Sequence, residues 1–143
     1  MPVFFHNEDY FFLPKNKLRI KKWITTVISA YSFKAGQINY IFTSDRQLLK
    51  INREYLDHDF LTDIITFDYT KKKTVSGDIF ISIERVRENA EIFESGFNLE
   101  LKRVIIHGIL HLVGFKDKSK QEKDEMKNAE DQALSSVSEL LII

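Results

Sequence analysis

Two histidines one helical turn apart are the residues of this sequence whose spacing best suits chemistry. His107 and His111 lie in an apolar run that we expect to be helical. Because residues four positions apart face the same side of an α-helix, both imidazoles can reach one divalent metal ion. Asp117, just beyond the expected end of this helix, can close the site from the other direction. A catalytic metal centre is the leading hypothesis, and a pair of hydrogen-bonded core histidines is the alternative.

The residue after the first histidine separates this pattern from the metalloprotease helix. In His-Glu-x-x-His, the glutamate next to the first histidine is the general base. Gly108 occupies that position here, so peptide hydrolysis by that route lacks its base. We also expect Gly108 to leave one side of the helix open beside His107.

The composition indicates one globular domain, residues 1–143, with 43% hydrophobic residues and no cysteine. Without cysteine, disulfides and thiolate metal ligands are excluded. No apolar stretch approaches the roughly 20 residues that span a bilayer, and no secretory signal is recognisable, so we expect a cytoplasmic protein and no membrane partner. The 21 basic and 21 acidic residues cancel. Basic clusters at 15–22 and 71–73 fit ordinary surface, although they are also compatible with local phosphate contact.

Hydrophobic periodicity predicts an α/β (α+β) fold, in which a small mixed sheet of about four strands packs with about five helices. We expect strands at 3–10, 37–43, 63–69 and 77–82, and helices at 15–33, 45–55, 83–95, 98–113 and 120–135. The metal site then lies at the C-terminal end of a buried helix. Expected caps are Ser44 or Asp45 for the second helix and Asn98 for the fourth, with Gly114 left-handed after the latter. The apolar tail 140–143 is expected to pack back onto the domain.

The histidine block resembles the signature of a known family. The run 107–115 reads His-Gly-Ile-Leu-His-Leu-Val-Gly-Phe, which is similar to the His-Gly-x-Leu-His-Leu-x-Gly-(Tyr/Phe) signature of the YbeY family of bacterial metal-dependent endoribonucleases. Three further blocks resemble that family: Asn52-x-x-Tyr55 followed by 59–67, the Gly-Asp-Ile strand 76–82, and Met126 with Glu130. The resemblance covers about residues 37–130.

Asp117 is the first departure from the family pattern. The family signature continues Asp-His, and its third histidine completes a three-histidine zinc site. An ungapped alignment places Asp117 at that histidine, whereas a one-residue slip places Lys118 there. We favour the ungapped alignment, because a carboxylate is an ordinary zinc ligand and lysine is a poor one at neutral pH.

The second departure is Leu56, which stands where the family has an arginine thought to act at the scissile phosphate. Leucine cannot do this, so the catalytic residues remain unknown. Arg53 and Arg103 are weak candidates for a replacement cation, and surface or helix-pairing roles are the alternative for both. Three other polar residues can orient the metal ligands or simply lie at strand ends and turns: Thr62, Asp63 and Asp78.

The resemblance implies a single-strand-specific, zinc-dependent endoribonuclease with one Zn²⁺ per chain. It implies action in ribosomal RNA maturation at the 16S 3′ end and in ribosome biogenesis, with ribosomal RNA, the small ribosomal subunit and its assembly factors as partners. Whether a metal-activated water or the ribose 2′-hydroxyl is the nucleophile stays open. The alternatives are an RNA-binding ribosome-assembly factor with a mainly structural zinc site, which Leu56 favours, and a metal-dependent hydrolase of another substrate.

Overall fold

Residues 2–137 and 143 are described by the computed structural model of the chain. Over these residues the expected α+β class is confirmed, with a small mixed sheet of four strands and five helices. The elements in chain order are β1 Val3–Asn7, α1 Lys17–Ala30, β2 Lys34–Thr43, α2 Asp45–Leu56, β3 Ile64–Asp68, β4 Thr74–Ser82, α3 Ile83–Ile92, α4 Phe97–Leu112 and α5 Lys120–Ser135. None of the described helices combines the length and the hydropathy that a membrane span requires.

The four strands lie side by side in the order β1-β2-β4-β3. β1, β2 and β4 are parallel, and β3 is antiparallel to β4. Because side chains alternate between the faces of a strand, Ile38, Tyr40 and Phe42 of β2 share one face, and all three are buried. This face of the sheet carries the main hydrophobic core.

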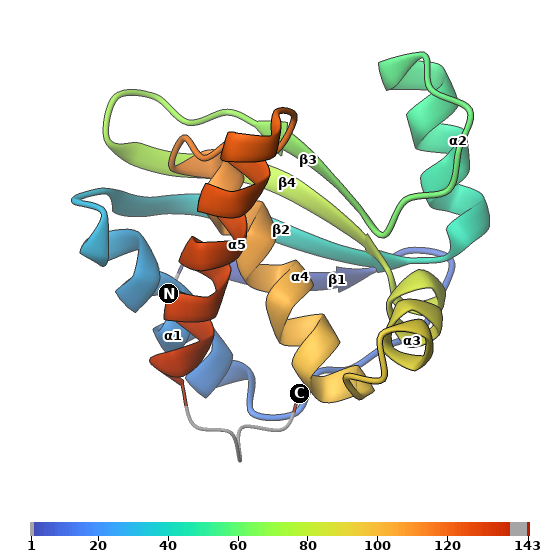
Figure 1. The fold of residues 1–143 in the computed structure, drawn as a ribbon, viewed down its shortest axis with the longest axis horizontal. Helices are drawn as coiled ribbons and strands as arrows, with labels where there is room; N and C mark the ends of the chain where they lie inside the picture. The colour runs from blue at the N-terminus through green and yellow to red at the C-terminus, as the bar shows by residue number, and fades with distance from the viewer. Residues whose placement is uncertain (1, 138–142) are drawn as a thin grey trace.

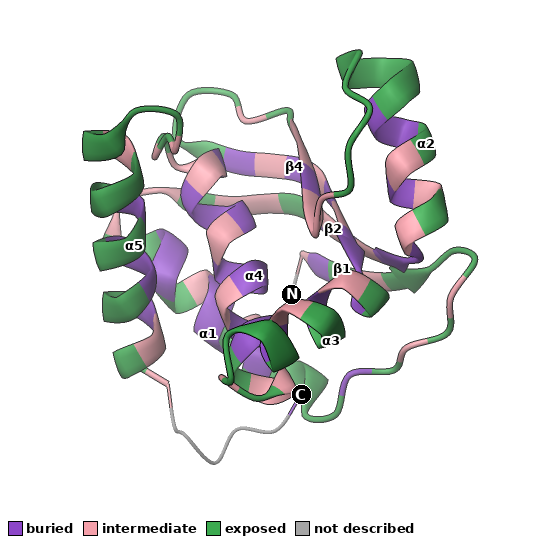
Figure 2. Ribbon diagram, turned by 45° about the vertical axis from the view of Figure 1, so that its right-hand side comes forward, coloured by how far each residue is buried: buried purple, intermediate pink, exposed green. Residues whose placement is uncertain are grey.

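α4 crosses the middle of the molecule under this core face, with α1 beside it and α5 on its outer side (Figure 1). Buried residues lie on several sides of the helix, as expected for an apolar run without a polar face (Figure 2). They include Leu101, Ile105, Ile106, Ile109 and Leu110. A helix enclosed in this way is held by close packing over most of its length, which makes it a rigid support for side chains at its end.

α2 packs against the opposite face of the sheet. Its buried residues Leu48 and Ile51 form a small separate cluster with Ile65 of β3. That face also carries polar side chains: the Nδ2 atom of Asn39 donates to Oδ1 of Asp78 over 3.1 Å. Asp78 therefore faces away from α4 and the histidine pair.

The start of α2 agrees with the sequence-based expectation, and the start of α4 differs from it. Ser44 caps α2, as one of the two expected residues, because its hydroxyl accepts a hydrogen bond from Gln47 N. The prediction that Asn98 caps α4 is wrong: Gly96 occupies the cap position, and Asn98 Oδ1 instead accepts from Ile143 N over 2.7 Å. Asn98 thus holds the C-terminal residue, which is a tertiary contact that no local pattern encodes.

The apolar tail was expected to pack back onto the domain. Its residues 140–142 lie outside the described part of the chain. Ile143 is described and is 6% exposed within the main core.

Gly108 does not leave an opening beside His107, contrary to expectation. A Cβ atom at this position would lie 3.1 Å from two side-chain carbons of Ile79 and 3.2 Å from Ile64 Cδ1. The glycine therefore lets α4 approach β3 and β4 closely, and this approach sets the distance between the sheet and the histidines.

Tyr40 connects the sheet directly to α4. Its buried hydroxyl donates a hydrogen bond of 2.9 Å to the carbonyl oxygen of Ile105, two residues before His107. Burial holds the pKa of this hydroxyl well above its usual value, so it remains a donor at all ordinary pH.

Replacing Tyr40 with Phe removes this hydrogen bond and keeps the ring. We expect the free energy of unfolding to fall by about 1 kcal/mol, because the bond is buried. Tyr55→Phe is a matched control: its ring is 67% exposed, and we expect a change below about 0.5 kcal/mol. Denaturant titration measures the free energy of unfolding of the two variants. A Tyr40→Phe protein as stable as wild type would show that the hydrogen bond to the Ile105 carbonyl does not stabilise the fold.

Candidate metal centre

Three side chains from the end of α4 and the segment after it converge on one point. The Nε2 atoms of His107 and His111 lie 3.0 Å apart. Each of them lies 3.2 Å from Oδ2 of Asp117. The structure thus brings together all three residues that the sequence predicts as metal ligands.

The size of this triangle fits a metal ion. Ligand atoms about 2.0–2.2 Å from a tetrahedral zinc ion are about 3.3–3.5 Å apart, from the geometry of a tetrahedron. The three edges of 3.0, 3.2 and 3.2 Å are only slightly shorter. Small outward shifts of the side chains would therefore place all three atoms at coordination distance from a shared ion.

The other nitrogen of each ring fixes the direction of its lone pair. His107 Nδ1 lies 2.6 Å from Oε2 of Glu130, and His111 Nδ1 lies 3.1 Å from the carbonyl oxygen of Phe115. Both partners are acceptors, so Nδ1 is the donor in each ring and the Nε2 atom of a neutral ring carries the lone pair. Second partners of this kind are typical of histidines that bind metals.

The turn after α4 positions both Phe115 and Asp117. Gly114 has φ +110, so the expected positive φ is confirmed. Gly114 N donates to His111 O over 3.0 Å, and Phe115 N donates to Leu110 O over 2.9 Å, which are the two hydrogen bonds of a Schellman motif. This motif folds the chain back over the helix end, which brings the Phe115 carbonyl to the His111 ring.

α5 supplies the remaining partner of the histidine pair. It begins directly after the Asp117 segment with a capping box between Ser119 and Glu122. Met126, Ala129 and Glu130 then lie on its buried side against α4. Glu130 is 7% exposed and holds both His107 and Arg103, whose Nη1 atom lies 2.8 Å from Oε1.

The electrostatic field at the centre favours positive charge. Burial alone would lower the pKa of His107, but the hydrogen bond and charge of Glu130, together with the charges of Asp117 and Asp63, outweigh it and raise the pKa. Acidic groups that favour a proton on this ring also favour a metal cation in front of it. The donor set and the field are therefore both suited to a divalent ion.

The triad opens into a cleft of about 790 Å³, which we call the main cleft. Its walls come from α2, the loop 57–63, β3 and the segment 114–118. The lining includes Asn52, Leu56, His58, Phe60, Thr62, Asp63, Thr66, Asp68, His107, His111, Lys116, Asp117 and Lys118. A cleft of this size can admit part of a polymer chain next to the metal centre.

Asn52 holds the loop that forms one wall of the main cleft. Its buried side chain donates to the Phe60 carbonyl oxygen over 3.0 Å. Within this loop the rings of His58 and Phe60 stack, with centroids 5.1 Å apart. Phe60 remains 56% exposed, so an aromatic surface is available beside the triad.

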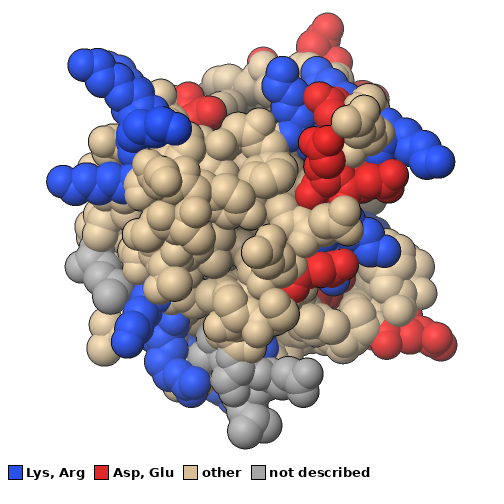
Figure 3. Space-filling view, turned by 60° about the vertical axis from the view of Figure 1, so that its left-hand side comes forward, with Lys and Arg blue, Asp and Glu red and all other residues tan. Residues whose placement is uncertain are grey.

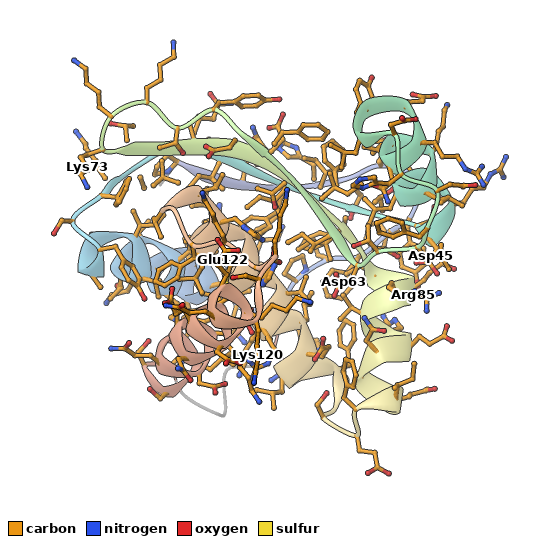
Figure 4. The ribbon with its side chains drawn as sticks, turned by 45° about the horizontal axis from the view of Figure 1, so that its top comes forward. Asp45, Asp63, Lys73, Arg85, Lys120 and Glu122 are labelled. Carbon is orange, nitrogen blue, oxygen red and sulfur yellow. The ribbon has the colours of Figure 1, made fainter. Side chains whose placement is uncertain are left out.

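The three additional polar residues named from the sequence lie in different places. Thr62 and Asp63 line the main cleft. Burial raises the pKa of Asp63, although His107 and a hydrogen bond from Asn89 act in the opposite direction. Figure 4 shows Asp63 near Asp45 and Arg85, where β3 begins and α3 starts. Asp78 lies on the opposite sheet face and cannot orient the metal ligands.

The two candidate arginines and Leu56 are separated in the structure. Leu56 lines the main cleft. Arg53 forms an exposed ion pair with Asp59. Arg103 pairs with Glu130 and with Asp131, at 2.8 and 2.9 Å. Arg103 therefore joins α4 to α5, and the cations that line the main cleft are Lys116 and Lys118.

Sequence reasoning missed the role of Glu130 and of the Phe115 carbonyl. A signal for Glu130 was present, because it lies on the same helical stripe as Met126, Ala129 and Ala133. A carboxylate on an otherwise apolar stripe needs a partner in the core. The Phe115 carbonyl carries no sequence signal, since any residue supplies a carbonyl oxygen.

A family model described as "Endoribonuclease YbeY" matches residues 6–138. A protein of that name from Parabacteroides distasonis is 47% identical over 135 residues, which cover 94% of this chain and 95% of that protein. One from Phocaeicola vulgatus is 53% identical over 116 residues, covering 81% of this chain and 84% of that protein. The solution structure of TM1509 from Thermotoga maritima has a TM-score of 0.63 and 26% identity, and covers 94% of this chain and 90% of that one.

We expect the purified protein to contain about one metal ion per chain. His107→Ala and Asp117→Ala should each abolish stoichiometric binding, because two remaining ligands hold zinc poorly. His58→Ala removes a histidine of the same cleft outside the triad, and it should retain the metal. Elemental analysis by mass spectrometry gives the metal content per chain of the three variants. Full metal occupancy in either triad variant would refute the site.

Glu130→Gln should weaken metal binding about 10- to 100-fold, because it removes the carboxylate that orients and polarises His107. Asp131→Asn is the matched control: Asp131 also pairs with Arg103 but does not contact a histidine. Competition with a zinc-binding dye measures both affinities. Equal affinities of the two variants would show that Glu130 serves only the ion pair with Arg103.

Proposed function

The chain belongs to the endoribonuclease YbeY family, and we propose that it cleaves single-stranded RNA at a divalent metal ion held by His107, His111 and Asp117. The observation that carries this proposal is the triangle of ligand atoms with edges of 3.0 to 3.2 Å. Family membership supplies the reaction, and the triangle supplies a place for it.

The bound ion is zinc, one per chain. Two imidazole nitrogens and a carboxylate oxygen are a known catalytic zinc set, and they leave a position for water or for a phosphate oxygen. When bound, such an ion lowers the pKa of water and offsets negative charge on the phosphate. The chain's own contribution is to aim the two rings through Glu130 and the Phe115 carbonyl, and to bring Asp117 to them.

RNA binds along the main cleft. Its bases are splayed in single strands and can stack on exposed aromatic rings. Phe60, 56% exposed, and the adjacent ring of His58 provide such a surface next to the triad. Leu56 on the same wall is 41% exposed and adds apolar contact.

Lys116 and Lys118 take the place of the family arginine as the positive charges near the scissile phosphate. They flank Asp117 in sequence and line the main cleft with it. Attraction of RNA is local, because the net charge of the whole chain is zero. In the face shown in Figure 3, charged side chains gather toward the edges and the centre carries neither sign.

The biological role is maturation of ribosomal RNA, at the 3′ end of 16S rRNA, and hence ribosome biogenesis in the cytoplasm. Partners are the small ribosomal subunit and its assembly factors. This part of the proposal rests on the family alone. Leu56 favours one second candidate, an RNA-binding assembly factor whose zinc is mainly structural, because the cleft lacks the arginine found at that position in the family.

Cleavage of a labelled single-stranded RNA oligonucleotide separates the two candidates. We expect wild-type protein to cleave it, chelator to stop cleavage, and added Zn²⁺ to restore it. His111→Ala should reduce the rate to background, whereas His6→Ala, on the opposite sheet face, should cleave at the wild-type rate. Gel electrophoresis of the products measures these rates. A wild-type protein with full metal occupancy and no cleavage would favour the assembly-factor role.

A further inference from the structure

A second cavity adjoins the metal centre. We call it the side cavity: it lies between α3, α4 and α5, has a volume of about 570 Å³, and shares His107 and Asp117 with the main cleft. Its other lining residues are Phe93, Ser95, Leu99, Glu100, Arg103, Lys123, Met126, Lys127 and Glu130. A strand in the main cleft whose phosphate meets the triad therefore has the side cavity next to it.

Two polar groups in the side cavity lack hydrogen-bond partners. Glu100 is only 6% exposed, and its carboxylate has no hydrogen-bond partner among the described residues, although its oxygens are not fully enclosed by protein. Ser95 Oγ is buried and has no partner among the same residues. An enclosed polar group without a partner costs free energy, as at Ser95, and the open Glu100 carboxylate can accept hydrogen bonds, so both groups are suited to meeting a ligand.

Nearby cations offset the negative charge of the Glu100 carboxylate only weakly among the described residues. Burial raises the pKa of its carboxyl, Asp63 adds to this rise, Arg103 opposes it, and Glu130 raises it further. The guanidinium of Arg103 is already engaged by Glu130 and Asp131. A neutral ligand with N–H donors would serve this carboxylate without bringing another negative charge close to it.

Three residues give the side cavity an apolar part of its wall. Phe93 is 63% exposed, Leu99 is 43% exposed, and Met126 is buried behind them. Exposed large apolar residues next to convergent polar groups are the usual composition of a small-molecule subsite. Lys123 and Lys127 lie at the same cavity and supply positive charge for a phosphate.

We propose that the side cavity binds the base of the nucleotide adjacent to the cleaved phosphodiester, and that Glu100 selects guanine there. This assignment rests on the proposed function. Guanine offers two neighbouring N–H donors, N1–H and the N2 amino group. The two oxygens of one carboxylate can accept a hydrogen bond from each of them. Adenine, cytosine and uracil each present fewer donors in that geometry. Phe93 and Leu99 contact the base, and Ser95 Oγ meets one of its remaining polar atoms.

Cleavage of a randomised single-stranded RNA pool, read by sequencing of the product ends, tests the selectivity. We expect wild-type protein to prefer guanine on one side of the cleaved bond. Glu100→Gln keeps the shape but replaces one acceptor with a donor, so it should lower this preference about tenfold at unchanged metal content. Glu91→Gln changes an exposed glutamate of α3 outside the cavity and should leave the preference as in wild type.

Binding of nucleoside 5′-monophosphates gives a readout that does not depend on cleavage. In NMR titrations we expect guanosine monophosphate to shift the methyl signals of Leu99 and Met126, and to bind about tenfold more weakly to Glu100→Gln. Leu99→Ala, at an exposed position that does not threaten the fold, should weaken binding as well. Leu18→Ala, 74% exposed on α1, should not.

The outcomes separate the two proposals. RNA cleavage with the same base preference in wild type and Glu100→Gln would overturn the guanine assignment and leave the endoribonuclease proposal intact. Shifts confined to residues outside the side cavity would overturn the site itself. Guanosine monophosphate binding at Leu99 and Met126 in a protein that cleaves no RNA would support the site and overturn the proposed cleavage.

Discussion

Three lone pairs are aimed at one another in the space between His107, His111 and Asp117. Two Nε2 atoms and a carboxylate oxygen lie within 3.2 Å of one another, while the second nitrogen of each ring donates to Glu130 or to a backbone carbonyl. Three acceptors at such distances repel unless a cation lies among them. The same acidic surroundings raise the pKa of His107, which means that a proton is stabilised there when no metal competes. The three side chains and their acidic surroundings therefore favour positive charge at this point.

The side chains of His107, His111 and Asp117 can share a cation only if they stay close together. The fold restricts their movement in two ways. Both histidines lie on α4, which is buried on several sides and approaches the sheet closely at Gly108. Asp117 lies on a short link between the Schellman motif of α4 and the capping box of α5. Because both helix ends are fixed by their own hydrogen bonds, the link between them has few conformations. A carboxylate on so short a link stays beside the two imidazoles.

The sequence determined the strands, the helices and the histidine pair because these follow from short-range periodicity. Helical spacing alone places His107 beside His111, and a glycine after an apolar run predicts the turn at Gly114. The misses depend on long-range contacts. Asn98 resembles a helix cap, yet it binds the backbone of Ile143, and Gly108 packs against β3 and β4 that precede it by many residues. Asp78 was grouped with Thr62 and Asp63, which line the main cleft, but it points to the other face, because strand register decides the side.

The uncharged side chain of Leu56 does not leave the main cleft without positive charge. Phosphate contact requires positive charge near the metal centre, and it does not require that charge to come from α2. Lys116 and Lys118 stand on either side of Asp117, so one short segment supplies the third residue of the triad and two cations of the main cleft. The side cavity adds Lys123 and Lys127 from the next helix. The cations of the main cleft thus follow α4, whereas Leu56 at the end of α2 and the rings of His58 and Phe60 in the next loop form a surface suited to bases more than to phosphates.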